Sequence, residues 1–508
     1  MDARMVHYLL ANTSHEVSSG ITILFASLLV ALILCLALEE KLHAKKSVIA
    51  GVAAVVCLFL GAMCEILPFQ KVLVGSTKLE VEAEPPKDAV TAEKVAEETT
   101  AAEKPAVYSG GHEISMPVYI PGIDWGVIAI ILGSSLFVDI TSKSGLFTWI
   151  AIKVTKASRG DPQKLLFSYG LMTVVFSAVL NNVTAMIIVG SLTVVSLEKL
   201  NRREKLLGFL LIEGLLTNIG GLLTLISSVP NIIVGTTAEI SFVEFFVKAG
   251  PYVVVATIAT LVMGGKLFGI QRLKTDEERA EAQELVAGFD ENTGIESWRF
   301  FYFATVMLVL FIATIATTSV LPWIQNLEMG YVALAFAAIM LVRYASRVDE
   351  FYKAVDWDLL GFFMCLFVVI YVMEHALVLE AIGHGLQMVL RDITSETASL
   401  VDASLLLVGA AGFSSVTDNI PLAAMLASIL DRLGAPQSSG LWWSVIFGAN
   451  LGGNLTPIGS ASTLVAVTIM HKHGLAMSFG KFVKIAVAYA AVQIVLALIY
   501  VAILIYVT

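Results

Sequence analysis

The chain has 508 residues, of which 57% are hydrophobic and only 15% are charged, and its mean hydropathy is +0.83. Soluble domains carry about 25% charged residues, so a water-soluble fold of this length would lack the polar surface that its domains need. The composition therefore predicts a chain that is surrounded by lipid over most of its length. The formal net charge of −10, from 32 basic and 42 acidic residues, argues against a nucleic-acid partner.

Ten apolar stretches are long enough to cross about 30 Å of hydrocarbon. We expect spans at 20–38, 47–67, 121–141, 206–227, 249–268, 300–320, 329–342, 357–378, 440–468 and 485–507. Two further apolar stretches, 165–197 and 402–430, are too long for one span and too short for two, and polar residues interrupt the middle of each. Each is predicted to be a re-entrant hairpin, with a kinked pair of short spans as the alternative.

Lysine and arginine indicate the orientation, because short cytoplasmic loops are enriched in them. Alternation of the ten spans with both termini outside places 23 of the 32 basic residues in the cytoplasm. The first hairpin then opens inward and the second outward. The segment from Lys78 to Glu113 falls outside, and its nine acidic residues and four lysines hold half of the excess negative charge. Its Ala/Glu/Pro-rich composition predicts a disordered loop.

Three landmarks recur in the same order along the chain. Asp124-Trp125 returns as Asp356-Trp357, Asn181-Asn182 as Asp418-Asn419, and the Asn-Ile-Gly-Gly that starts at Asn218 as an Asn-Leu-Gly-Gly, with offsets of 232, 237 and 232. Because the first copy starts outside and the second inside, we expect inverted repeats. Inverted repeats with interrupted helices in matching positions are typical of secondary transporters, whose binding site lies between the repeats.

The pattern predicts an all-α polytopic membrane protein of about ten transmembrane helices plus two re-entrant hairpins, arranged as two inverted repeats with broken helices. The expected divisions are a two-helix extension (1–68), the acidic loop (69–118), the first repeat (119–268), a cytoplasmic loop (269–299), connecting helices (300–353) and the second repeat (354–508).

Glycine and proline are expected to break one helix in each repeat. Gly220-Gly221 and Pro230 lie in the first copy, and Gly452-Gly453 and Pro457 in the second. Irregular backbone survives inside a membrane only where it is buried or lines a wet cavity. Each break would free carbonyl groups for a cation and helix N-termini for an anion.

The joint pattern resembles the ion transporter superfamily, which contains NhaD-type sodium/proton antiporters, arsenite permeases, the melanosomal P protein and dicarboxylate carriers. The resemblance covers about residues 117–508, and it is carried by IDWGVIAIILGSSLFVDI, SAVLNNVTAMIIV, TNIGGLLTLISSVPNIIVG, SSVTDNIPLAA and GANLGGNLTPIGSAST. It implies a homodimer with a static scaffold and a moving transport domain, which is an elevator mechanism. It does not specify a substrate.

Two departures from the superfamily pattern concern charge. Relatives near the arsenite permeases and the P protein usually have Asp-Asn in the first hairpin, where this chain has Asn181-Asn182. Their first broken helix usually has Ile-Gly-Asp-Pro-Pro-Asn, where this chain has the segment from Ile226 to Asn231 without an acid. The first repeat has therefore lost two acids at its expected site.

Asp418 is the strongest candidate for ion coupling, because an ionisable side chain within an apolar stretch is costly and is by default functional. Its alternative role is to pair with backbone N–H groups. Glu213 is the second candidate for proton coupling and could replace the lost acid, as could Asp139, which lies near a span end. The predicted ion- or substrate-binding residues are Asn181, Asn182, Thr184, Asn218, Gly220, Gly221, Thr224, Asn231, Thr417, Asp418, Asn419, Asn450, Gly452, Gly453 and Thr456.

Two transport functions remain open at this point, and a membrane-embedded enzyme or partner subunit ranks below both. The energy source would be an ion gradient or a separate ATPase subunit, because the sequence has no GxxxxGK[ST] phosphate-binding loop. The first function is sodium/proton antiport or a related cation-coupled exchange. The second is a permease for an anion such as arsenite or a di- or tricarboxylate (citrate-like), which the loss of two acids favours. We expect no cofactor beyond Na⁺ or H⁺ as coupling ions, no bound metal beyond Na⁺, no enzyme activity, contact with membrane lipid, and a multi-pass location in a prokaryotic inner membrane.

Overall fold

The computed structural model describes residues 17–67, 72–74, 77–79, 107–109, 112–114, 117, 119–120, 122–395, 398–417 and 419–507. Within this part of the chain, eight helices are long and apolar enough to cross a membrane. They are α2 (Ser19–Ala37), α4 (Lys46–Met63), α6 (Trp125–Ser142), α9 (Asn182–Lys199), α12 (Phe242–Leu267), α14 (Trp298–Ala316), α17 (Trp357–His375) and α23 (Phe479–Val507). The all-α, multi-pass fold class predicted from the sequence is thus confirmed.

The remaining predicted spans differ from long straight helices. The stretch 329–342 forms α15 (Glu328–Arg343), and the chain then bends by 93° into η3 (Ala345–Arg347) and α16 (Val348–Ala354). The stretches 206–227 and 440–468, expected as spans with internal breaks, are indeed interrupted. They form α10 (Leu206–Gly220), η2 (Leu225–Ser227) and α11 (Val229–Thr237) in the first case, and α21 (Gly440–Gly452) and α22 (Ala461–Lys472) in the second.

Close packing explains why each broken helix has glycine where it ends. A Cβ atom at Gly220 would lie 2.6 Å from the carbonyl oxygen of Val174, and one at Gly452 would meet the carbonyl oxygen of Ala411. Pro230 then sits in the first turn of α11, where the missing N–H is not needed for an intrahelical bond. The glycines therefore determine where each first helix segment ends, and Pro230 favours the start of α11.

The two stretches predicted as re-entrant hairpins each form a pair of helices. The first pair is α8 (Pro162–Val179) with α9, and the second is α19 (Leu400–Ser414) with α20 (Asn419–Arg432). The members of each pair contact each other. Leu180 and Asn181 have extended backbone at the first break. Entry and exit on one side of the membrane remain predictions.

The shorter elements lie between these helices. They are α3 (Glu39–Leu42), α7 (Leu146–Ser158), η1 (Arg203–Lys205), α13 (Asp276–Ala287) and α18 (Val378–Val389). Two antiparallel strand pairs, β1 (Val72–Val74) with β4 (His112–Ile114) and β2 (Thr77–Leu79) with β3 (Val107–Ser109), lie in the segment predicted to be a disordered loop. Most of that segment lies outside the described residues.

The order of helices from α6 to α12 recurs from α17 to α23, with each element beginning 232 to 238 positions later. The first helices of the two sets begin in the same way. Asp124 accepts a hydrogen bond from the N–H of Val127, and Asp356 accepts one from the N–H of Leu359. The repeated Asp-Trp motif is thus an N-cap motif in both copies.

Two helix pairs, α2 with α4 and α14 with α15, lie outside these two sets, and one helix of each pair packs along the first helix of a set. α15, which follows the first set, packs along α6, whereas α4, which precedes the first set, packs along α17 of the second. Small residues allow the close approach, with Gly133 of α6 against Ala333 and Gly51 of α4 against Cys365. The predicted extension 1–68 and connection 300–353 therefore make equivalent contacts.

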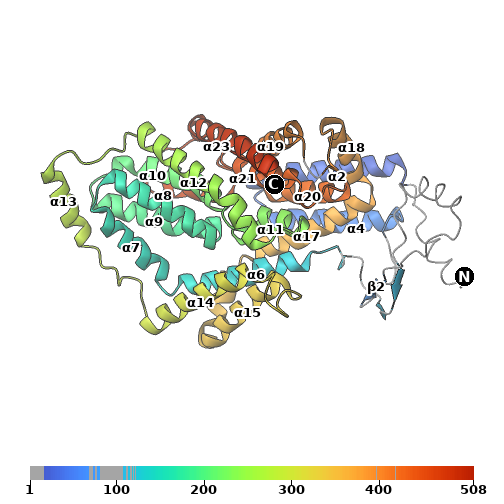
Figure 1. Cartoon of the computed structure of the whole chain (residues 1–508), viewed down its shortest axis with the longest axis horizontal. Helices are drawn as coiled ribbons and strands as arrows, with labels where there is room; N and C mark the ends of the chain where they lie inside the picture. Colours follow the sequence, from blue (N-terminus) through green and yellow to red (C-terminus); the bar gives the residue numbers. More distant parts are fainter. Residues whose placement is uncertain are drawn as a thin grey trace, which may run out of the picture.

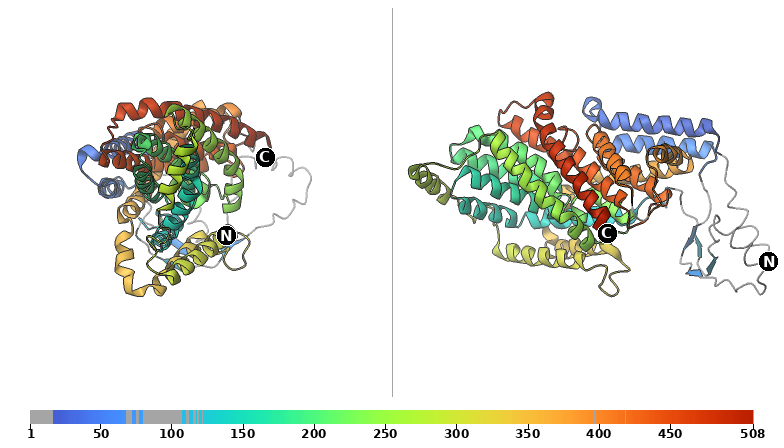
Figure 2. Two further views of the ribbon diagram at one scale, coloured as in Figure 1. Left: turned by 90° about the vertical axis from the view of Figure 1, so that its left-hand side faces the viewer. Right: turned by 45° about the horizontal axis from the view of Figure 1, so that its top comes forward.

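The described part of the molecule is elongated, with α7 to α10 toward one end and α2, α4, α17 and α18 toward the other (Figure 1). α6, α11 and α21 lie between these groups. The helix pair α2 and α4 and the helix pair α14 and α15 lie on different sides of the molecule (Figure 2). α13 and the strand pairs lie at opposite ends (Figure 1).

A strap, defined here as residues 270–297, crosses the end of the molecule near α7 and α8. The buried Asp161 caps α8 through the N–H of Lys164 and also accepts a hydrogen bond from the N–H of Leu273 in the strap. Glu291 pairs with both Lys153 and Lys156 of α7, at 2.6 and 2.9 Å. The strap thereby ties the α7–α8 corner to α14, which begins directly after it.

We predict that Glu291→Gln loosens the strap at neutral pH. The two lysines hold the pKa of the Glu291 carboxyl below its ordinary value, so the folded-state pKa is below that of the unfolded chain. The stabilisation is therefore present at pH 7 and is lost as the pH falls through that lowered pKa. Amide hydrogen exchange across 276–297 should be faster in the variant than in the wild type at pH 7, and the difference should vanish once the pH has fallen below the lowered pKa of Glu291.

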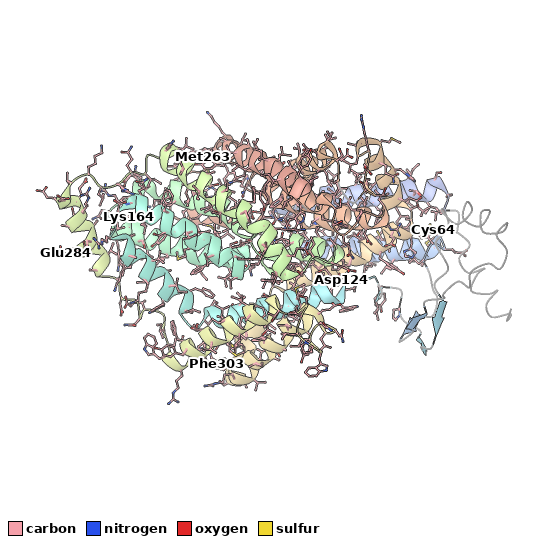
Figure 3. The ribbon with its side chains drawn as sticks, viewed as in Figure 1. Cys64, Asp124, Lys164, Met263, Glu284 and Phe303 are labelled. Carbon is pink, nitrogen blue, oxygen red and sulfur yellow. The ribbon has the colours of Figure 1, made fainter. Side chains whose placement is uncertain are left out.

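Glu284→Gln is the matched control, because Glu284 lies on the exposed side of α13 at the end of the molecule (Figure 3). It changes the charge by the same amount without removing a lysine partner from α7. Equal exchange in all three proteins at pH 7 would show that the Glu291 pairs do not hold the strap.

Candidate functional site

A cavity of about 370 Å³ lies where the breaks of the helices meet. One wall is a single face of α6, formed by residues at helical spacing: Ile131, Ser134, Ser135, Val138 and Asp139. The facing wall comes from the α8–α9 and α19–α20 breaks and from the two broken helices. The cavity therefore lies between α6 and the elements that carry the predicted site residues.

Besides α17, which Asp356 caps, four helices begin at the wall of this cavity. α9 contributes Asn182, α11 contributes Val229, α20 contributes Asn419, and α22 contributes Ala461. The N-terminus of a helix carries the equivalent of about half a positive charge and several N–H groups without intrahelical partners. The convergence of four such ends makes the surroundings of the cavity favourable to negative charge.

Side-chain amides join the two broken helices across the centre of the molecule. Asn218 of α10 donates to Ser460 at the start of α22, at 2.9 Å, and Ser228 at the start of α11 donates to Asn450 of α21, at 2.8 Å. Asn450 in turn donates to Asn231, at 2.9 Å. Because Ser228 and Ser460 occupy equivalent positions in the two repeats, the two bonds are related by the same internal symmetry.

The second amide pair extends this network into the surrounding helices. Asn218 also donates to Asn454, at 2.8 Å, and Asn454 donates to Gln493 of α23, at 2.9 Å. Gln493 then donates to Thr260 of α12, at 3.0 Å. All four side chains are buried, so the network satisfies polar groups that would otherwise be costly in an apolar interior.

Hydroxyl groups fix the helix pairs to the broken helices in the same way in both copies. Thr224 donates to the carbonyl oxygen of Ala178 and Thr456 to that of Ser415, both at 2.6 Å. Ser177 donates to the carbonyl oxygen of Thr217, as Ser414 does to that of Ala449. These bonds satisfy backbone carbonyls near the breaks.

Two carboxyl groups belong to the cavity wall in the described part of the chain. Asp139 pairs with Lys143 one turn later, at 3.1 Å, and Asp356 caps α17. No lysine or arginine is among the described lining residues, and no cluster of three metal-ligating side chains occurs in the described residues. An anion in this cavity would thus be bound by helix ends, amides and hydroxyls.

The structure brings some of the predicted site residues to the cavity and places others behind it. Asn181, Asn182, Thr184, Asn218 and Asn419 line the cavity. Behind it, the network or the close packing at the breaks involves Gly220, Gly221, Thr224, Asn231, Asn450, Gly452, Gly453 and Thr456.

One predicted residue, Thr417, lies away from the cavity wall, and another, Asp418, is not described. Thr417 donates to the carbonyl oxygen of Phe413 in its own chain segment and is not among the described lining residues. Asp418 lies outside the described residues. Asn181, predicted as a ligand, caps α9 through the N–H of Thr184 at 2.7 Å while it lines the cavity.

Glu213 lies on α10 behind the cavity and is fully buried. One carboxyl oxygen accepts a hydrogen bond from Thr193 of α9, at 2.6 Å. The other oxygen has no hydrogen-bond partner in the described residues. Glu213 does not line the cavity.

Serines at the cavity were missed by residue-level prediction from the sequence. Ser134 and Ser135 of α6 and Ser460 and Ser462 of the second break line it. The sequence did contain a signal for α6, because the polar pair Ser134-Ser135 interrupts an otherwise apolar helix segment. Ser460 stands in the same place after its break as Ser228 does in the first copy.

The sequence matches the citrate transporter family over residues 106–448. Uncharacterized transporters of Mycobacterium bovis and Mycobacterium tuberculosis are each 31% identical over 385 residues, which cover 75% of this chain and 86% of theirs. The P protein of Homo sapiens is 24% identical over 447 residues, which cover 74% of this chain and 53% of that protein.

Two solved transporters share the fold. The YdaH transporter of Alcanivorax borkumensis has a TM-score of 0.56 at 12% identity, covering 91% of this chain and 98% of its own. MtrF of Neisseria gonorrhoeae, described as illuminating a class of antimetabolite efflux pumps, has a TM-score of 0.52 at 12% identity, covering 91% and 95%. The apolar helices and the bacterial relatives identify a multi-pass protein of the inner membrane. The chain belongs to the citrate transporter family, within the ion transporter superfamily that its motifs resemble.

Proposed function

We propose that this chain is a secondary transporter that carries a small multivalent carboxylate anion, such as citrate, across the membrane together with a cation. The observation that carries the proposal is the convergence of four helix N-termini on one cavity. The family match to citrate transporters supports the same substrate class. A cavity of about 370 Å³ also falls in the size range of sites that bind small molecules.

The neutral side chains of the first repeat favour an anion over a bare cation. Asn181 and Asn182 line the cavity, and Ser228 lines it in the first broken helix. The superfamily pattern that the motifs resemble usually has an acid at the positions of Asn181 and Ser228. Each missing carboxylate removes a repulsion of about 3 kcal/mol per substrate charge, for a separation of about 5 Å and an effective dielectric constant of about 20. Amides and hydroxyls can instead donate hydrogen bonds to carboxylate oxygens.

Coupling requires a cation that enters with the anion or leaves in exchange for it. Asp139 and Asp356 contribute carboxyl oxygens to the cavity wall, and Asp418, which precedes the lining residue Asn419, remains our candidate for binding Na⁺ or H⁺. A cation held near the anion would also reduce the cost of moving multiple negative charges through a low-dielectric region. We therefore assign energy conversion to a Na⁺ or H⁺ gradient.

The hydrogen-bond pattern supports an elevator movement. Among the described residues, the side chains at the breaks bond to one another and to α8, α19 and α21, and the hydrogen bonds of Asn182, Asn218 and Ser228 all go to elements other than α6. The two broken helices and their helix pairs could thus move together against α6. We propose that α6, α15, α17 and α4 belong to the static scaffold, and that a homodimer embedded in lipid holds this scaffold in place.

Sodium/proton exchange is the second candidate function. The specific observation in its favour is the pair of carboxyl groups, Asp139 and Asp356, on a wall that also offers amide and hydroxyl oxygens. Oxygen atoms of this kind bind hard cations. The pairing of Asp139 with Lys143 weakens this candidate, because the lysine already neutralises one of the two carboxylates.

Transport by the purified protein in proteoliposomes should separate the two candidates. We expect labelled citrate or another di- or tricarboxylate to accumulate when a pH or sodium gradient is imposed, and to exchange with unlabelled substrate inside. A pH-sensitive dye measures sodium-driven proton movement in the same vesicles without any carboxylate. Proton movement driven by sodium alone, with no carboxylate uptake, would favour the exchanger and contradict the anion transporter.

Asn181→Asp should reduce carboxylate transport about a hundredfold. Asp caps a helix as well as Asn does, so the bond to the N–H of Thr184 survives while a negative charge is added to the cavity wall. At about 5 Å that charge opposes the nearest substrate carboxylate by about 3 kcal/mol, which corresponds to about a hundredfold. The measurement is the initial rate of labelled citrate uptake at substrate concentrations below saturation.

Asn181→Ser is the matched control, because serine also caps helices but adds no charge. It should retain uptake within a few-fold of the wild type. The outcome opposed to our proposal is an Asp variant that transports carboxylate normally or gains sodium/proton exchange, since a cation site would tolerate the carboxylate that relatives have at this position.

A further inference from the structure

We propose that Glu213 is a proton-binding site of this transporter, separate from the substrate cavity and placed behind it. The inference rests on the proposed function, in that the bound proton would couple to the anion in the cavity. The residue is unusual in its segment, because α10 is otherwise built of apolar residues, glycine, threonine and asparagine. Its carboxyl group is fully buried, and one of its oxygens lacks a hydrogen-bond partner in the described residues.

The surroundings of Glu213 contain no described side chain that would neutralise a carboxylate by an ion pair. The titratable group that faces it from α8 is Tyr169, and among the described residues it accepts a hydrogen bond from Thr193 alone. The packed helix α12 carries Glu244, Lys248 and Tyr252 in its first half. The other titratable groups of α8, α9, α12 and α22 lie in their end turns: Lys164, Glu198, Lys199, Lys266, His471 and Lys472. Arg203, Glu204 and Lys205 of η1 precede α10.

An uncompensated carboxylate in such surroundings costs several kcal/mol, whereas a carboxylic acid needs only hydrogen-bond partners. Glu213 therefore holds a proton in the conformation described here. The unpartnered oxygen gives that proton a position without steric conflict. A purely structural role would be met more cheaply by glutamine or by an apolar residue of the same size.

A row of buried hydroxyl groups leads from Glu213 toward α7. Thr193 and Ser196 lie one turn apart on the same side of α9, and the hydroxyl of Ser196 lies 2.6 Å from that of Tyr169. The Tyr169 hydroxyl in turn lies 2.6 Å from that of Thr155 on α7. All of these side chains are fully buried. Hydroxyl groups both donate and accept, so the row can pass protons once the step between Thr193 and Ser196 is bridged.

Glu213 is close enough to the cavity for its charge to influence an anion there. It precedes the cavity-lining Asn218 by five residues on α10, which is about 7.5 Å along the helix axis. A neutral Glu213 does not oppose an anion, whereas an ionised one repels it through protein of low dielectric constant. Proton and anion therefore favour each other's binding, and they move in the same direction.

The test compares two transport modes in proteoliposomes that contain the Glu213→Gln variant. Glutamine keeps the volume and the hydrogen bond from Thr193 but cannot release a proton. We expect accumulation of labelled citrate under an imposed pH gradient to fall at least tenfold. Counterflow exchange of external labelled citrate for internal unlabelled citrate should stay within about threefold of the wild type, because that mode needs no net proton movement.

Two further variants identify the role of the residue. Glu213→Asp keeps a titratable group and should recover part of the gradient-driven accumulation, whereas Glu284→Gln on the exposed side of α13 should change neither mode. Retention of full gradient-driven accumulation by Glu213→Gln would overturn the proposal. Loss of both modes in a variant that folds and is still stabilised by citrate would overturn it as well, since the residue would then act in transport generally.

Infrared difference spectroscopy tests proton binding without relying on transport. The wild-type protein in nanodiscs at pH 7 should show the C=O stretching band of a protonated carboxyl group, and this band should be missing from Glu213→Gln. An unchanged spectrum would overturn the proton site even if citrate is transported. A missing band in a protein that transports no carboxylate would instead support the proton site while the proposed function fails.

Discussion

The need to satisfy backbone groups at two helix breaks inside an apolar interior governs this structure. Each break leaves N–H and C=O groups without intrahelical partners, and lipid offers none. The chain meets this need with short side chains close to each break: Thr224 and Thr456 bond to carbonyl groups of the neighbouring helix pairs, and Asn231 bonds to the carbonyl groups of Gly221 and Thr224. The helices that restart beyond the breaks begin at the cavity. The same irregularity that would destabilise an ordinary membrane helix thus shapes the cavity wall.

The recurring order of helices places the two breaks side by side at the centre of the molecule. Asn218 and Asn450 occupy equivalent positions and form hydrogen bonds with Ser460 and Ser228, respectively. The polar side chains of each broken helix therefore find hydrogen-bond partners on the other. The exchange of outer helices, with α4 on α17 and α15 on α6, connects the two sets of helices in the same reciprocal way. Both features make the fold depend on contacts between residues more than two hundred positions apart.

Much of the fold could be predicted from the sequence because membrane crossing imposes length and apolarity on each segment. The positions of the breaks followed from Gly220, Gly452 and the prolines beyond them, and the repeated Asp-Trp and Asn-Gly-Gly motifs indicated which residues correspond. The contribution of α6 to the cavity wall could not be predicted, because the sequence does not tell which helices Ser134 and Ser135 face. The strap was expected only as a loop, because its contacts with Asp161, Lys153 and Lys156 join segments distant in sequence. The predicted ligands on the broken helices proved to be divided between the cavity wall and the network behind it.

The distribution of charge around the cavity has a consequence for coupling. In a symmetric site with an acid at each helix-pair break, a cation would be bound at equivalent positions and an anion would be repelled by both. Here the first break carries the neutral Asn181, and a fully buried carboxyl group of the first repeat lies on α10 instead, at Glu213. In the proposed mechanism, the titrating group is separate from the first break, so the anion meets neutral donors there while the proton acts on it from behind through a low-dielectric region. Such an arrangement needs the two groups to move as one body, and the hydrogen bonds that link α10 to α22 across the centre provide that rigidity.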